Sequence, residues 1–299
     1  MAAPLRLGCR ALSVARGEAV EALEHLQDQL YTKENIDYDQ QKRIDKNRED
    51  KNKRLSFAIM GQADFQLVNK MLYETHHPYE VLTRHLGLVS GVGSIPDVDR
   101  QLESILLKNL TLVAYDEVGR PVGVVVNNSS VLGELATTME EALAEVGDPR
   151  YRPIRAILHQ LRMDNKRVYE EIGTDKMFSI RMFGVSPLAQ GQGIATNLVR
   201  RSILLAGCLG FRCSLLDIFT IALFQQKPVT LASRAIKSEV TGVFGKKTFE
   251  KVGMLPASTI DYSTFEFEGS RPFAGIADRD QGITFWKKKF FQSALKHIL

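Results

Sequence analysis

A glycine-rich turn between a strand and a helix is the feature that most constrains this chain. The turn is Gln190–Ala195, with the sequence QGQGIA. Residues 177–185 before it alternate well enough to form a strand, and Ser186-Pro187 ends that run. Apolar residues after it recur at roughly helical spacing: Ile194, Leu198, Ile203 and Leu205. Two glycines let several N–H groups converge, and the helix adds its positive dipole end, so the turn predicts a pyrophosphate-binding site.

The spacing within the turn separates it from two other phosphate-binding motifs. No lysine follows the second glycine, which excludes the P-loop, and Ala195 is followed by Thr196 and Asn197 rather than by the last glycine of a dinucleotide fingerprint. The alternative is that the turn needs glycine only because its backbone adopts a positive φ, and that it binds no ligand. The residues Gln190-x-x-Gly193-x-Ala195 do fit the pattern R/Q-x-x-G-x-G/A.

Together with the strand that ends at Phe183-Gly184-Val185, this pattern resembles the coenzyme A loop of the GCN5-related N-acetyltransferases. The resemblance implies that the strand's backbone pairs with the pantetheine arm and that the Val185 N–H donates to the thioester oxygen. It implies that the loop holds the pyrophosphate. The implied contacts to acetyl-coenzyme A come from Phe183, Gly184, Val185, Gln190, Gly191, Gln192, Gly193, Ile194, Ala195 and Thr196.

A second segment resembles the end of the same fold. Residues 239–245 lead into Phe249-Glu250-Lys251-Val252-Gly253-Met254, which is similar to the closing helix and turn of the family and matches its insect-type arylalkylamine N-acetyltransferase branch. The resemblance spans roughly Leu55 to Lys289. It implies an α/β (α+β) fold in which a mixed, mostly antiparallel sheet of six to seven strands is flanked by helices.

The order of elements from Leu55 onward agrees with that fold. Apolar patterning predicts a strand over 55–60, a helix over 63–73 and a helix over 96–107 that Pro96 opens. The runs 111–115 and 122–126 flank the turn 116–120 and predict an antiparallel hairpin. Residues 155–172 predict an extra helix before the cofactor strand.

Composition bounds the remaining possibilities. With 299 residues of which 44% are apolar, the chain can bury one large domain, which we place at 55–290. A net charge of +4 from scattered basic residues does not favour a nucleic-acid partner. Cys9, Cys208 and Cys213 form no C-x-x-C pair and no metal spacing with the histidines, which indicates a reducing compartment and no metal site.

Residues 1–54 predict a basic leader, a helix and a charged flexible linker. The first sixteen residues carry Arg6, Arg10 and Arg16 and no acidic residue, which fits either a mitochondrial presequence or a short unfolded arm. No run of about 18 apolar residues exists, so we expect no membrane span. We expect a cytoplasmic monomer, with a mitochondrial location as the alternative.

One segment departs from the family. Residues 214–234 stand where the family needs only a few residues, and joining Cys213 to Ala235 restores an ordinary family sequence. An intron read as coding sequence and a lineage-specific insertion remain equal alternatives. The apolar part, 215–224, is too short to span a membrane.

Acetyl transfer to an amine needs a base, and the resemblance places one at the end of the first helix. The insect enzymes carry a glutamate just before a proline there, and alignment on Pro78 puts His77 at that position, with Glu74 one helical turn away. An imidazole with an ordinary pKa near ~6.5 accepts a proton from an ammonium group at least as well as a carboxylate does. The alternative is that Glu74, His76 and His77 are only polar residues at a helix end.

The acid for the departing thiolate is less well supplied. The family commonly places serine or tyrosine before the final helix, where this chain has Thr241, Phe244 and Gly245. Only Thr241 retains a hydroxyl, so Thr241 orders a water, solvent protonates the thiolate, or the protein is slow. Tyr262 is a second candidate, although a tyrosine of the core or of a cross-strand pair explains it as well.

Three functions follow as hypotheses. The first is an acetyl-coenzyme A-dependent N-acetyltransferase for a small amine such as dopamine, serotonin or a polyamine, acting by direct attack. The second is an N-acyltransferase that uses a longer acyl-coenzyme A, and a panel of acyl donors separates the two. The third is a catalytically weak acyl-coenzyme A-binding paralogue, which coenzyme A would stabilise without any thiol release.

Overall fold

The computed structural model describes residues 55–89, 95–172, 174–206, 235–276 and 280–289. The expected leader, helix and linker over 1–54 and the suspected insertion over 214–234 lie outside the described residues. Within the described part, no helix is long and apolar enough to cross a membrane.

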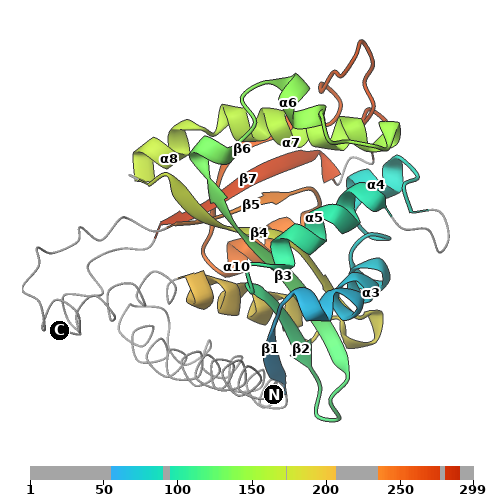
Figure 1. Cartoon of the computed structure of the whole chain (residues 1–299), viewed down its shortest axis with the longest axis vertical. Coiled ribbons are helices and arrows are strands. Elements are labelled where there is room, and N and C mark those ends of the chain that lie inside the picture. The colour runs from blue at the N-terminus through green and yellow to red at the C-terminus, as the bar shows by residue number, and fades with distance from the viewer. Residues whose placement is uncertain (1–54, 90–94, 173, 207–234, 277–279, 290–299) are drawn as a thin grey trace, which may run out of the picture.

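Seven strands form one sheet in the order β1-β2-β3-β4-β5-β7-β6 (Figure 1). Every neighbouring pair is antiparallel except β4 with β5, which is parallel. The predicted α/β fold with a mostly antiparallel sheet of six to seven strands is therefore confirmed. The strands are β1 Ser56–Met60, β2 Thr111–Tyr115, β3 Pro121–Val131, β4 Lys176–Val185, β5 Ala235–Val240, β6 Leu255–Asp261 and β7 Gly282–Lys289.

The α-helices connect these strands, and short 3-10 turns precede or follow several of them. The predicted first helix, the helix opened by Pro96 and the hairpin are all present. The α-helices are α3 Phe65–Thr75, α4 Val81–His85, α5 Pro96–Leu106, α6 Met139–Leu143, α7 Arg152–Asp164, α8 Arg167–Ile172 and α10 Val243–Lys251, and a further helix is described over 194–206.

The prediction of one helix over 155–172 is wrong, because the helix is interrupted between α7 and α8. Asn165 ends α7 with φ −103° and ψ 12°. Its side-chain amide donates to the Leu161 carbonyl at 2.7 Å, and it also contacts the Ser258 hydroxyl on β6. The amide thus bonds to the backbone and to the sheet at the point where the helix stops.

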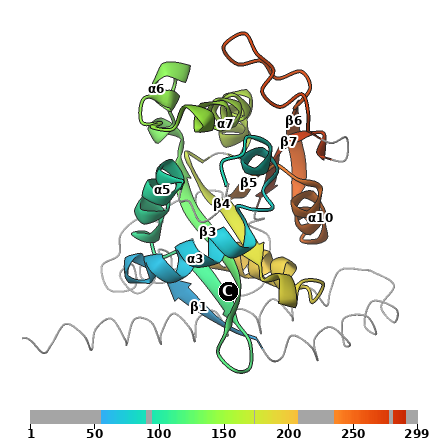
Figure 2. The same cartoon turned by 90° about the vertical axis from the view of Figure 1, so that its right-hand side faces the viewer.

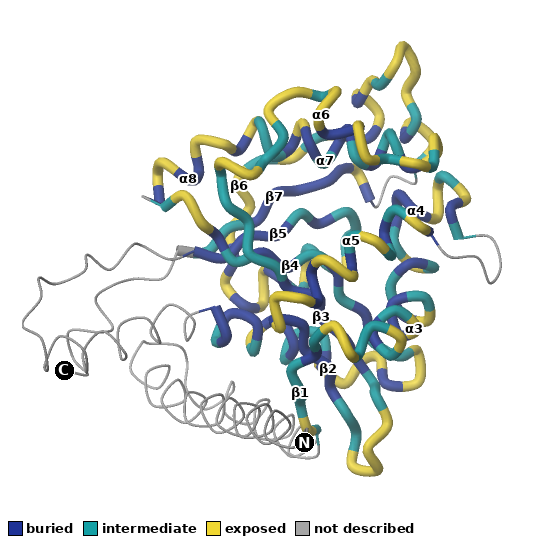
Figure 3. The backbone as a smooth tube through the Cα atoms, viewed as in Figure 1, coloured by how far each residue is buried: buried dark blue, intermediate teal, exposed yellow. Residues whose placement is uncertain are grey.

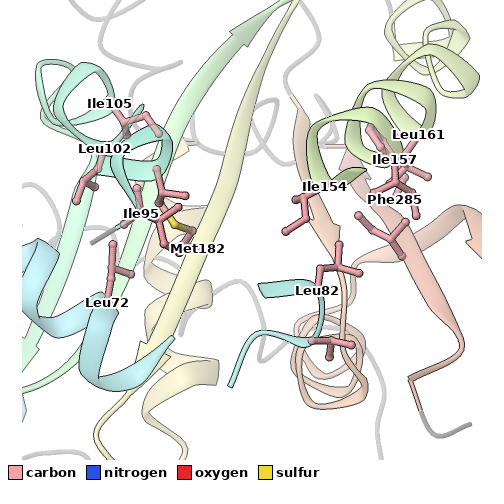
Figure 4. Packing of buried hydrophobic residues seen from close by; sticks show 14 of the residues in the cluster. Leu72, Leu82, Ile95, Leu102, Ile105, Ile154, Ile157, Leu161, Met182 and Phe285 are labelled. Carbon is pink, nitrogen blue, oxygen red and sulfur yellow. The ribbon is translucent and has the colours of Figure 1, made fainter. Parts of the chain in front are cut away.

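The two faces of the sheet carry separate cores. One core joins α3, α5, α7 and α8 to the sheet, and the other joins the 194–206 helix and α10 to it. Figure 2 shows α3 and α5 on one side of the sheet and α10 on the other. Most residues of the central strands are buried or partly buried (Figure 3). Figure 4 shows the first core, where Leu72, Leu102 and Met182 pack on one side and Ile157, Leu161 and Phe285 on the other.

A β-bulge in β4 shapes the centre of the sheet. Val126 pairs with Met182 and Asn127 pairs with Ile180, so Arg181 is an extra residue without a partner on β3. On its other edge, β4 pairs with β5 only from Phe178 to Ile180. Because a bulge bends its strand, β4 diverges from β5 after Ile180. In the described part of the chain, the segment 181–185 therefore has no strand paired to its β5 side, and we call it the free edge of β4.

Candidate active site

The free edge presents backbone groups that pair with no strand among the described residues. The Ser186 N–H donates to the Val122 carbonyl at 2.9 Å, so Ser186 faces β3. Backbone groups alternate between the two edges of a strand, which turns those of Phe183 and Val185 away from β3. The Phe183 carbonyl indeed bonds to the ring of His76 at 3.0 Å. The predicted donor, the Val185 N–H, thus lies where an extended ligand can pair with the strand.

The glycine-rich turn follows this edge. Gly191 and Gly193 have φ of 78° and 80°, which strongly favours glycine at both positions. A Cβ at either glycine would meet nothing within 4 Å, so open space surrounds both. Of the predicted loop residues, Ile194 is buried and anchors the helix, Ala195 and Thr196 are partly exposed, and the remaining four are exposed: Gln190, Gly191, Gln192 and Gly193.

The helix after the turn begins with amides that have no partner within the helix. Its first backbone bond runs from the Asn197 N–H to the Gly193 carbonyl, at 3.0 Å. The N–H groups of Ile194, Ala195 and Thr196 come before that bond, and such groups have no partner within a helix. Together with the helix dipole they form a site suited to an anion such as a pyrophosphate.

Gly184 lets α3 approach the free edge closely. A Cβ at Gly184 would lie 2.2 Å from the Thr75 hydroxyl and 2.8 Å from the Thr75 carbonyl carbon. Only a residue without a side chain fits between the strand and the last turn of α3. This contact places the end of α3, and with it His76, against β4.

His76 is the histidine that reaches the free edge. Because a carbonyl only accepts, the 3.0 Å contact from Nδ1 to the Phe183 oxygen places the ring proton on Nδ1. Nε2 then carries the lone pair of the neutral ring. Burial lowers the pKa of His76 below 6.5, and the Glu80 carboxylate and the bond to Phe183 oppose that shift. The ring is therefore neutral at pH 7, and Nε2 is the nitrogen that can accept a proton.

His77, the predicted base, faces the core instead. Its side chain is 2% exposed, and its Nε2 has no hydrogen-bond partner within the described residues. Its ring packs on Tyr73, with the ring centroids 4.8 Å apart. Burial, and to a lesser degree the neighbouring His76, lower the pKa of His77 to about 3. The expectation of an unperturbed imidazole is thus wrong, because the residue turns inward at the end of α3.

Glu74, the second predicted base, lies on the exposed side of α3. Its carboxylate is 58% exposed and sits 3.8 Å from the Lys70 ammonium, one helical turn earlier. Exposed pairs of this kind contribute little stability. The structure gives Glu74 no contact with the free edge.

Thr241 lies directly after β5 and contacts Tyr262. The Tyr262 phenol donates to the backbone carbonyl of Thr241 at 2.8 Å. Separately, the Thr241 hydroxyl makes no hydrogen bond in the described part of the chain. Burial raises the pKa of Tyr262 well above 10, and the carboxylates of Glu80 and Asp280 raise it further. Tyr262 thus holds its proton in a structural bond, one residue beyond β6. Phe244, near the start of α10, is 73% exposed.

Glu80 is a polar residue of this region that the sequence did not single out. It caps α4 by accepting from the Leu82 N–H at 3.1 Å and from the Thr83 N–H at 2.6 Å. Its charge acts on both His76 and Tyr262. Glutamate is not among the residues that favour an N-cap, so no capping signal in the sequence pointed to it. Among the described residues, no group of three or more potential ligands could hold a metal ion.

Comparison with known proteins gives structural matches only. No protein-family model matches the chain, and no curated protein matches it. The solved arylalkylamine N-acetyltransferase 2 of Aedes aegypti is 20% identical, with a TM-score of 0.64 over 78% of this chain and 98% of its own. Mosquito arylalkylamine N-acetyltransferase like 5b is 21% identical, with a TM-score of 0.64 over 79% and 100%.

A third solved structure is a polyamine N-acetyltransferase of Drosophila melanogaster that forms N-acetylagmatine. It is 15% identical, with a TM-score of 0.63 over 79% of this chain and 100% of its own. At these identities the matches show the fold. The chain has the fold of the GCN5-related N-acetyltransferases, in the form found in the insect arylalkylamine N-acetyltransferases.

Proposed function

We propose that this protein transfers the acetyl group of acetyl-coenzyme A to the nitrogen of a small amine. One observation carries the proposal: the free edge of β4 runs directly into a turn with two positive-φ glycines at a helix N-terminus. An extended thiol arm can pair with the edge while its pyrophosphate binds the turn, through residues 190–196. The names of the solved structures, arylalkylamine and polyamine N-acetyltransferases, support an amine as the acceptor.

The reaction is a direct transfer. The amine nitrogen attacks the thioester carbonyl carbon, the C–N bond forms, the C–S bond breaks, and the thiolate leaves with the electron pair. The Val185 N–H stabilises the negative oxygen that develops, a contribution of about 3 kcal/mol per preorganised donor. Before the attack, the ammonium form of the acceptor must lose a proton to become the neutral amine, and Nε2 of His76 accepts that proton. His77 and Glu74 stay as sequence predictions that the geometry does not favour.

The proposed site has few groups that can protonate the leaving thiolate. Thr241 is the hydroxyl predicted from the sequence, and it acts by ordering a water or by donating its own proton. The exposed Phe244 cannot donate a proton. This gap is the observation that favours the second candidate function, a catalytically weak acyl-coenzyme A-binding protein. A longer acyl donor is the third candidate. A cytoplasmic, monomeric protein with no nucleic-acid or membrane partner stays a prediction.

The test uses the purified full-length chain. Calorimetric titration with coenzyme A should show one binding event, and acetyl-coenzyme A with a panel of arylalkylamines and polyamines should release free thiol only when an amine is present. Acetyl, butyryl and palmitoyl donors in parallel decide the chain length. Coenzyme A binding without thiol release would make the weak paralogue the better description, and absence of binding would end the proposal.

A further inference from the structure

Glu80 stands between the end of α3 and the start of α4, one turn after the proposed base His76. Its backbone N–H donates to the His76 carbonyl at 2.9 Å. Its carboxylate accepts from the Leu82 N–H at 3.1 Å and from the Thr83 N–H at 2.6 Å, and the Thr83 hydroxyl also donates to it. Because the backbone and the side chain of Glu80 are both held, its charge has a fixed place near the end of α3.

The Glu80 charge acts on three rings. It helps to raise the pKa of the Tyr151 and Tyr262 phenols, for which burial is the larger cause. It also opposes the lowering of the His76 pKa by burial, and it does so more strongly than the bond to the Phe183 carbonyl. Of these three rings, only the imidazole becomes a cation when it takes up a proton. Glu80 therefore favours the imidazolium form of His76.

The described residues give Glu80 no basic ion-pair partner. No lysine or arginine among them forms a salt bridge with its carboxylate. Arg84 and His85, the basic residues of α4, are exposed, and the His85 ring bonds to the Pro272 carbonyl at 3.0 Å. The negative charge of Glu80 is therefore not cancelled by a paired cation and can act on His76.

The other groups that contact the His76 ring are neutral. The His77 ring lies 5.2 Å away between centroids, and it is neutral at pH 7 because its pKa is about 3. The Phe183 carbonyl of β4 meets Nδ1 at 3.0 Å. Among these neighbours from α3, α4 and β4, Glu80 is the one whose charge is opposite to that of an imidazolium.

We propose that Glu80 is a positioning residue for the acetyl transfer: its carboxylate stabilises the positive charge that His76 gains when Nε2 takes a proton from the ammonium group of the acceptor. The inference rests on the proposed N-acetyltransferase function. The proton moves to Nε2, and the amine nitrogen keeps the electron pair with which it then attacks the thioester. A buried cation is costly without a counter-charge, so the nearby carboxylate makes the imidazole a stronger base.

The first test removes the charge of Glu80 in the full-length protein. Thiol release with acetyl-coenzyme A and the best acceptor, measured between about pH 5 and pH 9, locates the acid limb of kcat. Glu80→Gln should lower kcat on the plateau about three- to ten-fold and move the acid limb to lower pH, because the imidazole is then a weaker base. Glu80→Asp keeps the charge and should lie closer to the wild type in both respects. Coenzyme A affinity should stay unchanged.

A second variant guards against an effect on folding. Serine is a favoured N-cap, so Glu80→Ser caps α4 without a charge. It should reproduce the lower kcat and the shifted limb of Glu80→Gln. Melting temperatures of both variants show whether α4 and the fold are retained.

Glu141 supplies the matched control. Its carboxylate accepts from the Thr137 N–H at 2.7 Å and from the Thr138 N–H at 3.3 Å, at the start of α6, which like α4 has five residues. Glu141→Gln thus removes a carboxylate from the start of an equally short helix that packs on α7. The acid limb of kcat should stay where the wild type has it.

The double variant decides whether Glu80 acts through His76. If it does, His76→Gln combined with Glu80→Gln should lose no more kcat/KM than His76→Gln alone, because no imidazole remains to be stabilised. Losses that multiply in full, or an acid limb that both Glu80→Gln and Glu80→Ser leave at the wild-type pH, overturn the inference and leave the proposed function standing. No thiol release by the wild type with any acceptor overturns the proposed function itself, and the inference with it.

Discussion

The Glu239 carboxylate on β5 lies 2.9 Å from the Arg181 guanidinium on β4, just beyond the last backbone pair of the two strands, Ile180 with Ser238. The ion pair thus bridges the strands where their hydrogen bonds stop. Arg162 of α7 binds the same carboxylate, so this ion-pair cluster links α7 to both β4 and β5. The side chain of Glu239 is 3% exposed, and those of Arg162 and Arg181 are 13% and 12% exposed.

Glu239→Gln should lower the free energy of unfolding by about 3–5 kcal/mol, because it leaves three buried cations without their counter-charge. Urea unfolding at pH 7 measures the change. Glu268→Gln, which breaks the surface pair with Arg152, is the matched control and should cost less than about 1 kcal/mol. Equal costs for the two variants would show that the buried network contributes no more than a surface pair.

The same carboxylate should give stability a dependence on acid pH. The surrounding cations hold the pKa of Glu239 well below 4.5, although burial alone would raise it. A carboxyl whose folded pKa is depressed contributes stability that is present above its unfolded pKa and is lost as pH falls through the folded value. The wild-type advantage over Glu239→Gln should therefore shrink as pH falls below about pH 4.5. Unfolding series between pH 7 and pH 3 check this, and a difference that persists undiminished at pH 3 would contradict it.

The two adjacent histidines should respond in opposite ways to substitution. His76→Gln keeps a donor for the Phe183 carbonyl but cannot accept a proton, so kcat/KM should fall about 10²-fold or more with little change in coenzyme A affinity. His77→Gln should chiefly lower stability, because it repacks a buried ring beside Tyr73.

The pH dependence of kcat distinguishes a base from a structural residue, because a purely structural role of His76 would not change the shape of that profile. The wild-type kcat should fall as pH drops through the His76 pKa, which lies below 6.5, and His76→Gln should lack that limb. The opposite pattern, with activity lost in His77→Gln alone, would restore the base predicted from the sequence.

Much of the fold follows from local patterns, and much of the site does not. The glycine turn, the strand before it and the hairpin each depend on residues that are close together in the chain, so local patterns predict them. Which of two neighbouring histidines reaches the site depends on where α3 ends, and periodicity fixes helix ends only to within a residue or two. Glu239 meets Arg162 across a separation of 77 residues, which no local pattern encodes. The bulge at Arg181 depends on the register between β4 and β3, so no local sequence pattern predicts it either.

Gly193 should be sensitive to any side chain. With φ at 80°, Gly193→Ala places an L-residue in the left-handed region at a cost of about 1–2 kcal/mol and distorts the turn. Coenzyme A affinity should fall several-fold by calorimetry. Gly133 has equally open space where a Cβ would stand and no positive φ, so Gly133→Ala is the matched control. This variant should leave coenzyme A affinity unchanged. An equal loss in both variants would remove the conformational explanation.

Gly184 tests whether the contact between α3 and the free edge organises the site. A methyl group at Gly184 would overlap both the Thr75 hydroxyl and its backbone, so Gly184→Ala must push the end of α3 away from β4. Overpacking of this kind costs about 1–3 kcal/mol. The same shift moves His76 from the Phe183 carbonyl, so kcat should fall more than coenzyme A affinity does. Thr75→Ser retains a hydroxyl and should not rescue Gly184→Ala, because the Thr75 carbonyl carbon would still lie 2.8 Å from the added methyl. Full activity in Gly184→Ala, with the expected loss of stability, would mean that the reaction does not depend on how His76 is seated on the strand.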